Sequence, residues 1–393
     1  MASHLVLKVG ISVSLSGQFQ VQGRQALIGL QAWADDVNRS GGIALGRRRP
    51  GAEVSVIHHD DSSKPEQAKH ITDRLITQDR VDLLFGPYSS VLSRAAAQVA
   101  ESQQRLIWNQ GGASDEIYQQ GYRWVVGVLT PASQYLTGLL ALVRQADPEV
   151  KTVGLLRAYP GTFPRMITTE VQRQADLLDF EVAYVGQYAP SLDDFSNILE
   201  ELREIGPQVL VTVGRISNDL KFAQQLVQRP LSLRAVAVVA APIRQFQEAL
   251  GDDVEGFIGP SQWEPAGTYP HDYGPSAHQV LASLSKLHQG QVDYPMAQSY
   301  AAGLVAQRCV EQAGTLEDQV LRETAGKLDF STFYGRFRID PGTGRQVGRS
   351  CLIVQWQEGR RLILWPPEQR QATLAHPWPG RRAKGVRGCP PAF

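Results

Sequence analysis

Cysteine is scarce in this chain, whose 393 residues include only Cys309, Cys351 and Cys389. An odd number of widely spaced cysteines is neither a disulfide framework nor a zinc-ligand pattern. Cys309 falls in a helical pattern and Cys351 in a strand pattern, so we expect buried thiols there. The sequence therefore argues against a small disulfide-stabilised fold and against a cysteine-based metal site.

An excess of charge of one sign is also absent, because Lys plus Arg and Asp plus Glu both number 39. No net field attracts a polyanion, so we expect no nucleic acid and no membrane surface as a partner. The longest apolar runs, 136–143 and 235–243, are too short to span a bilayer. Met1 to His4 lead straight into the first expected strand without a signal peptide. We expect either that an export signal was removed or that the protein stays in the cytosol.

Signatures of catalysis are missing as well. The chain has no Gly-x-Ser-x-Gly elbow, no phosphate-binding loop and no His-Glu-x-x-His pattern. The run 342–348 imitates a glycine fingerprint, but its spacing is wrong and it lies between two expected strands, so it predicts a hairpin turn. His58 and His59 are neighbours on an expected strand, where successive side chains point to opposite faces. We therefore expect no enzyme, no cofactor and no metal.

What the chain does have is a nearly unbroken alternation of strand and helix patterns. Two successive blocks, 5–129 and 130–260, each predict an α/β lobe built on a doubly wound parallel sheet. Three helices follow (276–289, 294–314 and 317–328), and then a hairpin around Glu358-Gly359. Residues 367–393 lose periodicity, and we expect a loose C-terminal tail there.

Two helices of the second block carry specific expectations. The pattern over 131–145 predicts one continuous helix. Another helix is expected over 193–205, with a start cap from Ser191 and Asp194. Gly206 followed by a proline is typical of its end.

Two apolar strands break into glycine and small hydroxyl residues where a helix should begin, at 85–90 and 106–114. Such a break leaves backbone N–H groups and hydroxyls that suit a carboxylate or an amide. Ser89 and Ser90 either cap the helix or hold a ligand. Gly111 and Gly112 form either a plain turn or a surface that lets a ligand approach the backbone closely.

Loops at the carboxyl ends of parallel strands are where doubly wound sheets bind ligands. If the two lobes face each other, these loops line one cleft. Arg215 follows such a strand and is either solvated or a clamp for a carboxylate. Trp263, near the expected second crossover, either walls the cleft or packs at the hinge.

The order of several segments resembles one known family. The matching segments include 14–17, 38–43, 59–61, 84–90, 298–303, 334–340 and 354–357. In this order they resemble the type I periplasmic solute-binding proteins of ABC transporters, in the Leu/Ile/Val-binding (branched-chain amino acid and amide) group. The resemblance extends over about 360 residues, from Val9 to Pro367.

The resemblance implies two lobes that are joined by three crossovers and close on a ligand by hinge bending. Lobe I would comprise 5–129 and 261–327, and lobe II 130–260 and 328–366. It implies a periplasmic receptor that captures a small amino acid, amide or related carboxylate and delivers it to an ABC permease. The alternative is a cytosolic amide or amino acid sensor of the same fold that regulates a protein partner.

The family's ligand site transfers to this chain only in part. Its polar head group would meet the hydroxyl of Ser90 and the backbone of Gly111 and Ala113. The family often has a threonine at the position of Ala113, so Ser114 would have to supply the hydroxyl. Tyr88 matches the aromatic residue of amide-binding relatives.

In lobe II, the covering aromatic residue falls on Tyr159 or Phe163, and the next loop offers Arg215. The acidic residue that pairs with an α-amino group should lie near Ala241 and Pro242, where the sequence has no carboxylate. This leaves an amide, a carboxylate or an aromatic acid open as the ligand. The expected ligand-binding set is Tyr88, Ser89, Ser90, Asn109, Gly111, Gly112, Ala113, Ser114, Tyr159, Phe163, Arg215, Pro242 and Trp263.

Overall fold

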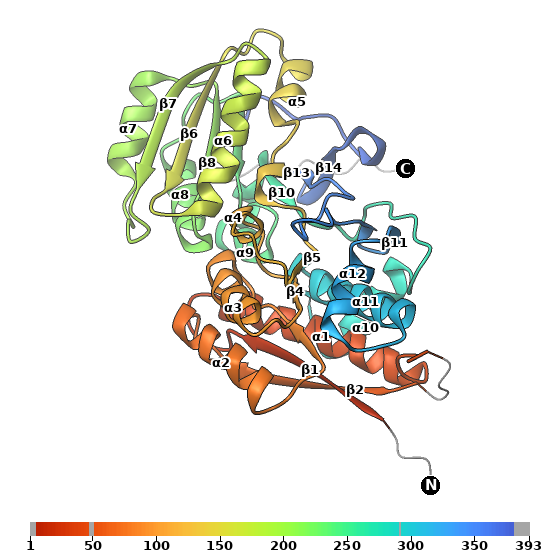
Figure 1. The fold of residues 1–393 in the computed structure, drawn as a ribbon. Helices are drawn as coiled ribbons and strands as arrows, with labels where there is room; N and C mark the ends of the chain where they lie inside the picture. Colours follow the sequence, from red (N-terminus) through yellow and green to blue (C-terminus); the bar gives the residue numbers. More distant parts are fainter. Residues whose placement is uncertain (1–4, 47–50, 291, 381–393) are drawn as a thin grey trace, which may run out of the picture. The chain divides into compact units, whose positions relative to one another are not determined.

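A computed structural model describes residues 5–46, 51–290 and 292–380 of the chain (Figure 1). The chain divides into two compact units: unit 1 comprises 1–135 and 262–351, and unit 2 comprises 136–261 and 352–393. The chain therefore passes from one unit to the other three times, after Tyr135, Ser261 and Cys351. Each unit has its own sheet and its own core.

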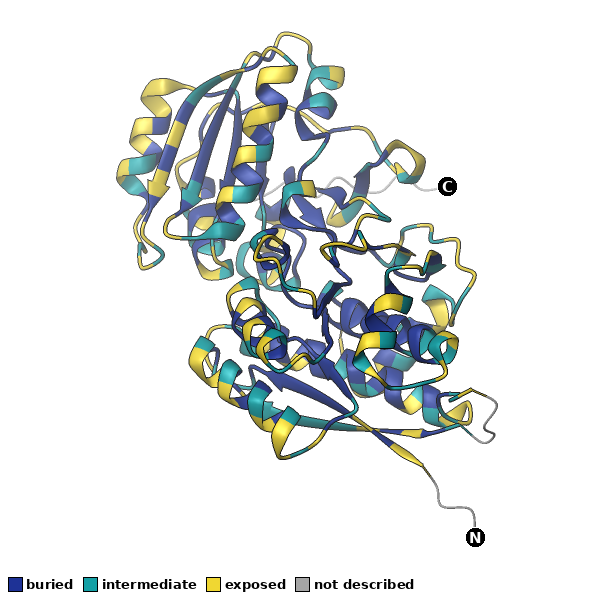
Figure 2. Cartoon of the chain, in the orientation of Figure 1, coloured by how far each residue is buried: buried dark blue, intermediate teal, exposed yellow. Residues whose placement is uncertain are grey.

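Unit 1 is built on a five-stranded parallel sheet in the order β2-β1-β3-β4-β5. Its strands are β1 (Val6–Val13), β2 (Glu53–Asp60), β3 (Leu83–Phe85), β4 (Ile107–Asn109) and β5 (Val125–Gly127). The central strands are buried on both faces, as expected for a sheet covered by helices on each side (Figure 2).

The helices of unit 1 pack in two groups: α2 lies against α3, and α1 lies against α11. The bounds are α1 (Gln20–Arg39), α2 (Pro65–Thr77), α3 (Ser90–Ser102), α4 (Glu116–Gln119), η1 (Ala132–Gln134), α10 (Ala277–Leu287), α11 (Tyr294–Ala313) and α12 (Asp318–Ala325), with the small hairpin β11 (Phe330–Thr332) and β12 (Gly335–Phe337). Glycine lets α1 and α11 touch, because a Cβ on Gly29 would lie 2.1 Å from the Met296 carbonyl oxygen.

Unit 2 is built on a seven-stranded sheet in the order β14-β13-β10-β9-β8-β6-β7. Its strands are β6 (Thr152–Ala158), β7 (Glu181–Tyr188), β8 (Val209–Val213), β9 (Ala235–Val238), β10 (Phe257–Ser261), β13 (Leu352–Gln357) and β14 (Arg360–Trp365). The helices are α5 (Leu139–Ala146), α6 (Thr162–Leu177), α7 (Ser196–Ile205), α8 (Ile216–Gln228) and α9 (Arg244–Leu250), with the short helices η2 (Gly251–Val254) and η3 (Pro367–Gln369). β13 and β14 join antiparallel, whereas β6 to β10 pair in parallel.

The five parallel strands of the two units follow the same order, since β7-β6-β8-β9-β10 repeats β2-β1-β3-β4-β5. This confirms the expected α/β fold of two doubly wound sheets. In such an order the connections leave the sheet on opposite sides between the first and third strands, which opens a crevice at their carboxyl ends. The topology therefore points to the loops after β1 and β3 in unit 1, and after β6 and β8 in unit 2.

Residues 328–351 correct the domain boundaries expected from the sequence, because they belong to unit 1 rather than lobe II. Their loop is hydrogen-bonded into the unit 1 sheet: Gly127 N donates to the Gly344 carbonyl oxygen at 2.8 Å. Arg322 Nη2 also donates to the Pro341 carbonyl oxygen at 2.9 Å. Residues 130–135 likewise belong to unit 1.

The expected loose tail is wrong as far as residue 380. Trp378 is 5% exposed, and its ring meets Phe257 edge-on at a centroid distance of 5.3 Å. Gln355 Nε2 donates to the Ala375 carbonyl oxygen at 2.8 Å, which ties this segment to β13. The rest of the expected tail, 381–393, lies outside the described residues.

Two smaller expectations also fail. The helix expected over 131–145 is interrupted between η1 and α5, where Leu136 and Gly138 adopt positive φ angles of 55° and 100°. The cap expected from Ser191 is not formed, because α7 begins one residue after Phe195. Asp194 instead accepts from the backbone N–H of Ser196 at 2.9 Å.

Two sequence expectations about single residues hold. Cys309 and Cys351 are buried as predicted. The third cysteine, Cys389, lies outside the described residues. His59, near the end of β2, pairs with a single carboxylate: its Nε2 lies 2.8 Å from Asp79 Oδ2.

Candidate functional site

The turn from β3 into α3 is a strained and tightly held segment of unit 1. Ser89 has a φ of 92°, in the region that favours glycine, and it is the N-cap residue of α3. Its Oγ accepts from the Leu92 N–H at 3.4 Å, and its own N–H donates to the Gly111 carbonyl oxygen at 3.0 Å. Ser89 is therefore a cap, and it also joins the β3–α3 turn to the loop after β4.

Ser90 forms the second connection between the same two loops. Its Oγ accepts from the backbone N–H of Ser114 at 3.0 Å. Because this bond uses the oxygen as an acceptor, the hydroxyl proton of Ser90 is available to an oxygen of a ligand. The structure thus brings together Ser90 and Ser114, which the sequence placed 24 residues apart.

The glycines of the loop after β4 are required by this close approach. A Cβ on Gly111 would lie 2.1 Å from the Pro87 carbonyl oxygen, and one on Gly112 would lie 2.5 Å from the Ser93 Cβ. The loops therefore pack against each other at a distance that excludes any larger residue. Both glycines are buried, and Ala113 beside them is 5% exposed.

Asn109, at the end of β4, stabilises this loop by hydrogen bonds, and the residue is 2% exposed. Its Nδ2 donates to the Gly112 carbonyl oxygen at 2.8 Å, and its Oδ1 accepts from the Gly112 N–H at 2.9 Å. Nδ2 also donates to the Tyr118 hydroxyl at 2.8 Å. These bonds occupy the amide group within unit 1, so Asn109 shapes the loop.

A pair of tyrosines stands next to the β3–α3 turn. The hydroxyl oxygens of Tyr88 and Tyr294 lie 2.7 Å apart, and Phe19 meets the Tyr88 ring edge-on at 6.2 Å. Burial raises the pKa of Tyr88 to about 12 and raises that of Tyr294 further, so both remain neutral hydroxyls. Sequence reasoning missed Phe19 and Tyr294. Phe19 could have been found, because it ends the loop after β1, one of the two loops that the strand order selects.

In unit 2, the predicted residues lie at the carboxyl edge of the sheet but differ in exposure. Tyr159 is 59% exposed, Phe163 is half-buried near the start of α6, and Arg215 is exposed at the N-cap of α8. Pro242 is buried, and its carbonyl oxygen accepts from the Arg361 guanidinium. The three exposed or half-buried side chains therefore stay predicted solute contacts, whereas the Pro242 carbonyl already has a partner.

Trp263 lies in the core of unit 1, where it is 1% exposed. Its ring stacks on Tyr269 at 6.1 Å, and its Nε1 donates to the Phe333 carbonyl oxygen at 3.1 Å. The residue therefore packs the interior beside the second crossover.

A carboxylate does lie close to the unit 2 loops, although the sequence has none at Ala241 or Pro242. Asp219, on the first turn of α8, is 1% exposed, and its Oδ2 accepts from the backbone N–H of Ala240 at 3.1 Å. Burial raises the pKa of this carboxyl group to about 8, so it is mostly protonated at neutral pH. A buried neutral acid is not a partner for the ammonium group of an amino acid.

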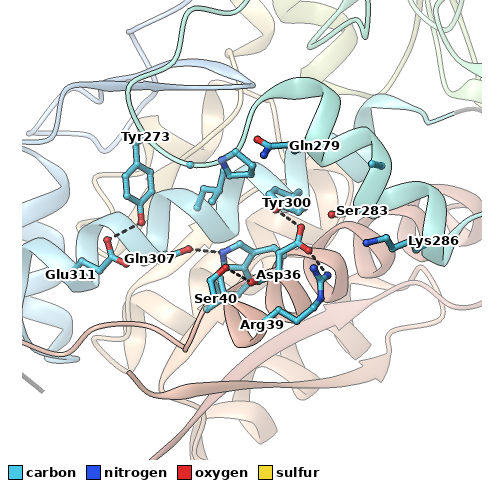
Figure 3. Close-up of a pocket in the computed structure, with 16 residues that line it drawn as sticks. Asp36, Arg39, Ser40, Tyr273, Gln279, Ser283, Lys286, Tyr300, Gln307 and Glu311 are labelled. Carbon is cyan, nitrogen blue, oxygen red and sulfur yellow. Dashed lines mark hydrogen bonds and ion pairs between the residues drawn. The ribbon is translucent and has the colours of Figure 1, made fainter. Parts of the chain in front are cut away.

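A groove of about 650 Å³ lies elsewhere in unit 1, between α1, α10 and α11 (Figure 3). Part of its lining comes from the last turns of α1, which lie at the edge of the sheet opposite to Ser90. None of the predicted site residues lines it. Three pairs of its polar groups are joined by the hydrogen bonds Tyr300–Asp36 (2.7 Å), Tyr273–Glu311 (2.9 Å) and Trp33–Gln307 (3.1 Å). Because these groups are already paired and none of the predicted residues lines it, the groove is not the site that the sequence predicts.

No group of three or more His, Cys, Asp or Glu side chains is placed to hold a metal ion in the part of the chain that the structure describes. Over the same residues, no helix has both the length and the apolar character that a membrane crossing requires.

Known proteins similar to this chain are solute receptors. Leu/Ile/Val-binding protein homolog 8 of Brucella abortus is 24% identical over 385 residues, covering 92% of this chain and 90% of that protein. The fold matches LivJ, a branched-chain amino acid transporter substrate binding protein from Streptococcus pneumoniae solved with isoleucine, at a TM-score of 0.77 and 16% identity, over 95% of this chain and all of that one.

A second solved structure holds a different solute. A solute binding protein of an ABC transporter from R. palustris, solved with benzoate, matches at a TM-score of 0.75 and 16% identity, over 96% of this chain and 99% of that one. The family model described as periplasmic binding protein matches residues 6–361. Together with the two doubly wound sheets and the three crossings of the chain, this match shows that the protein belongs to the periplasmic binding protein family, in its Leu/Ile/Val-binding branch.

Proposed function

We propose that this protein is the solute receptor of an ABC transporter and that it binds a small carboxylate through the loops after β3 and β4 of unit 1. The Ser90 hydroxyl is the observation that carries the proposal. It accepts from the Ser114 N–H and keeps its own proton for a ligand oxygen, at the edge of the sheet where doubly wound folds bind. A hydrogen bond to a charged oxygen is among the stronger kinds in proteins.

The solutes of similar proteins support a carboxylate. The structures solved with isoleucine, benzoate and 3,4-dihydroxybenzoic acid hold molecules that differ in size and polarity but share a carboxyl group. We propose that the same group meets Ser90 here. An aromatic or aliphatic acid without an α-amino group is favoured, because the carboxyl group that contacts this loop, through the Ala240 N–H, is the buried, neutral Asp219.

The aromatic groups beside Ser90 suit the apolar part of such a solute. Tyr88 and Tyr294 share one hydroxyl–hydroxyl bond, so one proton of the pair remains for a further acceptor. Phe19 adds an apolar face. That Phe163 and Arg215 of unit 2 contact the same solute stays a prediction, as do the periplasmic location and the ABC permease as partner.

Calorimetric titration with benzoate, 4-hydroxybenzoate and isoleucine tests the proposal. We expect the two benzoates to bind more tightly than isoleucine, and Ser90→Ala to weaken the binding of benzoate. The loss of one hydrogen bond to a charged group costs about 1.5–3 kcal/mol, or roughly ten- to hundredfold in Kd. Ser102→Ala is the matched control, because Ser102 lies at the far end of the same helix and its hydroxyl donates to the Val99 carbonyl oxygen.

Two results would count against the proposal. The first is a folded protein that binds none of the three acids. The second is a Ser90→Ala variant whose affinity for benzoate equals that of the Ser102→Ala variant.

A further inference from the structure

The loops at the carboxyl ends of β8 and β9 in unit 2 meet at a single side chain, that of Asp219. Its Oδ2 accepts from the Ala240 N–H at 3.1 Å, after β9. Its Oδ1 lies 2.8 Å from the position that a Cβ on Gly214 would occupy, after β8. Gly214 directly precedes Arg215, and Ala240 directly precedes Ala241, so this carboxyl group lies behind both loops that are expected to face the solute.

The surroundings of Asp219 are polar but uncharged. Tyr188, at the end of β7, is a titratable group that faces it, and the Thr212 hydroxyl on β8 lies beside the Tyr188 hydroxyl. Asn218, the neighbour of Asp219 on α8, donates instead to the Pro190 and Leu192 carbonyl oxygens, at 3.1 and 3.2 Å. Arg215, at the start of the same helix, is exposed, whereas Asp219 is 1% exposed.

The neutral form of the acid fits this environment better than the charged form. A buried carboxylate without a cation to offset its charge is costly, whereas a carboxylic acid both accepts and donates a hydrogen bond. The hydroxyl of Tyr188 is a buried neighbour, 2.1 Å from the position that a Gly214 Cβ would occupy. The buried Tyr188 hydroxyl and the Asp219 carboxyl group therefore lie together beside Gly214, an arrangement that suits a protonated acid.

We propose that Asp219 is a positioning residue that, in its neutral form, holds the Gly214–Arg215 and Ala240–Pro242 loops in place for the solute, so that solute capture weakens as the solution becomes more alkaline. The inference rests on the proposed function in one respect, namely that these loops contact the solute. Its structural part, the pH-dependent hold on the two loops, does not depend on any ligand.

The direction of the pH effect follows from where the proton binds more tightly. Burial raises the pKa of Asp219 to about 8 in the folded loops, while an opened loop returns it toward the ordinary value of 3.8. The closed state binds more protons between these two values, so its stability is complete below about pH 4 and decreases up to about pH 8. Above that pH both states are ionised and the stability difference stays constant.

Hydrogen exchange of the two loops, measured on the full chain from pH 5 to pH 9, tests the inference without a ligand. Asp219→Asn keeps the acceptor for Ala240 N–H and removes the titration. We expect exchange in the wild-type loops, relative to this variant at the same pH, to rise about tenfold for each pH unit up to about pH 8 and then to level off. Asp219→Ala, which removes the acceptor, should speed exchange at every pH.

Asp193→Asn is the matched control, since Asp193 is an exposed carboxylate that pairs with Lys221 in the same unit. It should leave the exchange of both loops unchanged. A wild-type to Asp219→Asn ratio that does not vary with pH would overturn the inference, and so would loops that open faster in Asp219→Asn than in the wild type at all pH values.

Titration with benzoate and isoleucine at pH 6 and pH 8 tests the link to solute capture. The affinity of the wild type should decrease with pH in proportion to the fraction of molecules with held loops, and that of Asp219→Asn should not. If neither acid binds but the exchange profile is as expected, the proposed function fails and the hold on the loops stands. If an acid binds but the exchange profile does not vary with pH, the proposed function stands and the hold of Asp219 on the loops fails.

Discussion

At the scale of single residues, the candidate site depends on positions that tolerate no side chain. Gly111 is the clearest case, because a Cβ there would lie 2.1 Å from the Pro87 carbonyl oxygen and 2.5 Å from the Tyr88 Cα. Backbone atoms cannot swing aside as a flexible side chain can. The Ser90–Ser114 hydrogen bond spans the same two loops, so its geometry depends on this glycine.

Gly111→Ala should therefore separate the two loops and weaken both stability and solute binding. Overpacking of this kind costs about 1–3 kcal/mol in the free energy of unfolding. Gly342→Ala is the control, because the nearest atom to its Cβ is an Asp340 oxygen at 3.4 Å, an ordinary contact. Urea denaturation measures both variants, and equal midpoints for the two would contradict the steric explanation.

At the scale of elements, the sequence pattern predicted the end of helix α7 correctly but not its start. Gly206 ends α7 in the left-handed conformation at φ 66°, and its N–H donates to the Leu202 carbonyl oxygen at 2.9 Å, as the sequence predicted. The start of α7 was not predicted correctly, because Phe195 packs edge-on against Phe222 at 5.4 Å and takes the N-cap position. A tertiary contact thus overrode a local capping preference.

Gly206→Ala isolates the conformational cost of this helix end. Nothing lies within 4 Å of a Cβ at this position, so the change adds strain but no clash. We expect a loss of about 1 kcal/mol in the free energy of unfolding, measured by urea denaturation. Solute affinity should be unchanged, because Gly206 lies at the amino-end edge of the unit 2 sheet. A stabilised Gly206→Ala protein would refute the assignment of strain to this residue.

At the scale of the whole molecule, each unit is completed by a segment that comes late in the sequence. Residues 328–351 complete unit 1, and residues 352–380 add two strands and the Trp378 segment to unit 2. Trp378 N donates to the Leu233 carbonyl oxygen at 3.1 Å, so this segment is attached by its backbone as well as by its ring. The last described residues are therefore part of the unit 2 core.

Trp378→Ala should destabilise unit 2 and leave unit 1 unaffected. Truncating a buried tryptophan costs about 3–5 kcal/mol. Hydrogen exchange followed by mass spectrometry should show faster exchange in peptides of 136–261 and 352–375, with no change in those of 5–135. The exposed Leu287 gives the control variant Leu287→Ala, with little expected effect on either set. Unchanged exchange across 233–261 would show that the segment is not structural.

The sequence by itself determined the fold class and most of the elements, and it singled out the loops after β3 and β4 that form the candidate site of unit 1. Strand and helix periods, helix-ending glycines and the break at residues 85–90 depend on residues that are close together in the sequence. They can therefore be predicted without the tertiary structure. The sequence did not predict which unit residues 328–351 and 367–380 join, because hydrogen bonds such as Gly127–Gly344 connect residues more than two hundred positions apart. Only the tertiary structure revealed the Tyr88–Tyr294 pair and the burial of Asp219, since the pKa of a carboxyl group depends on what surrounds it in space.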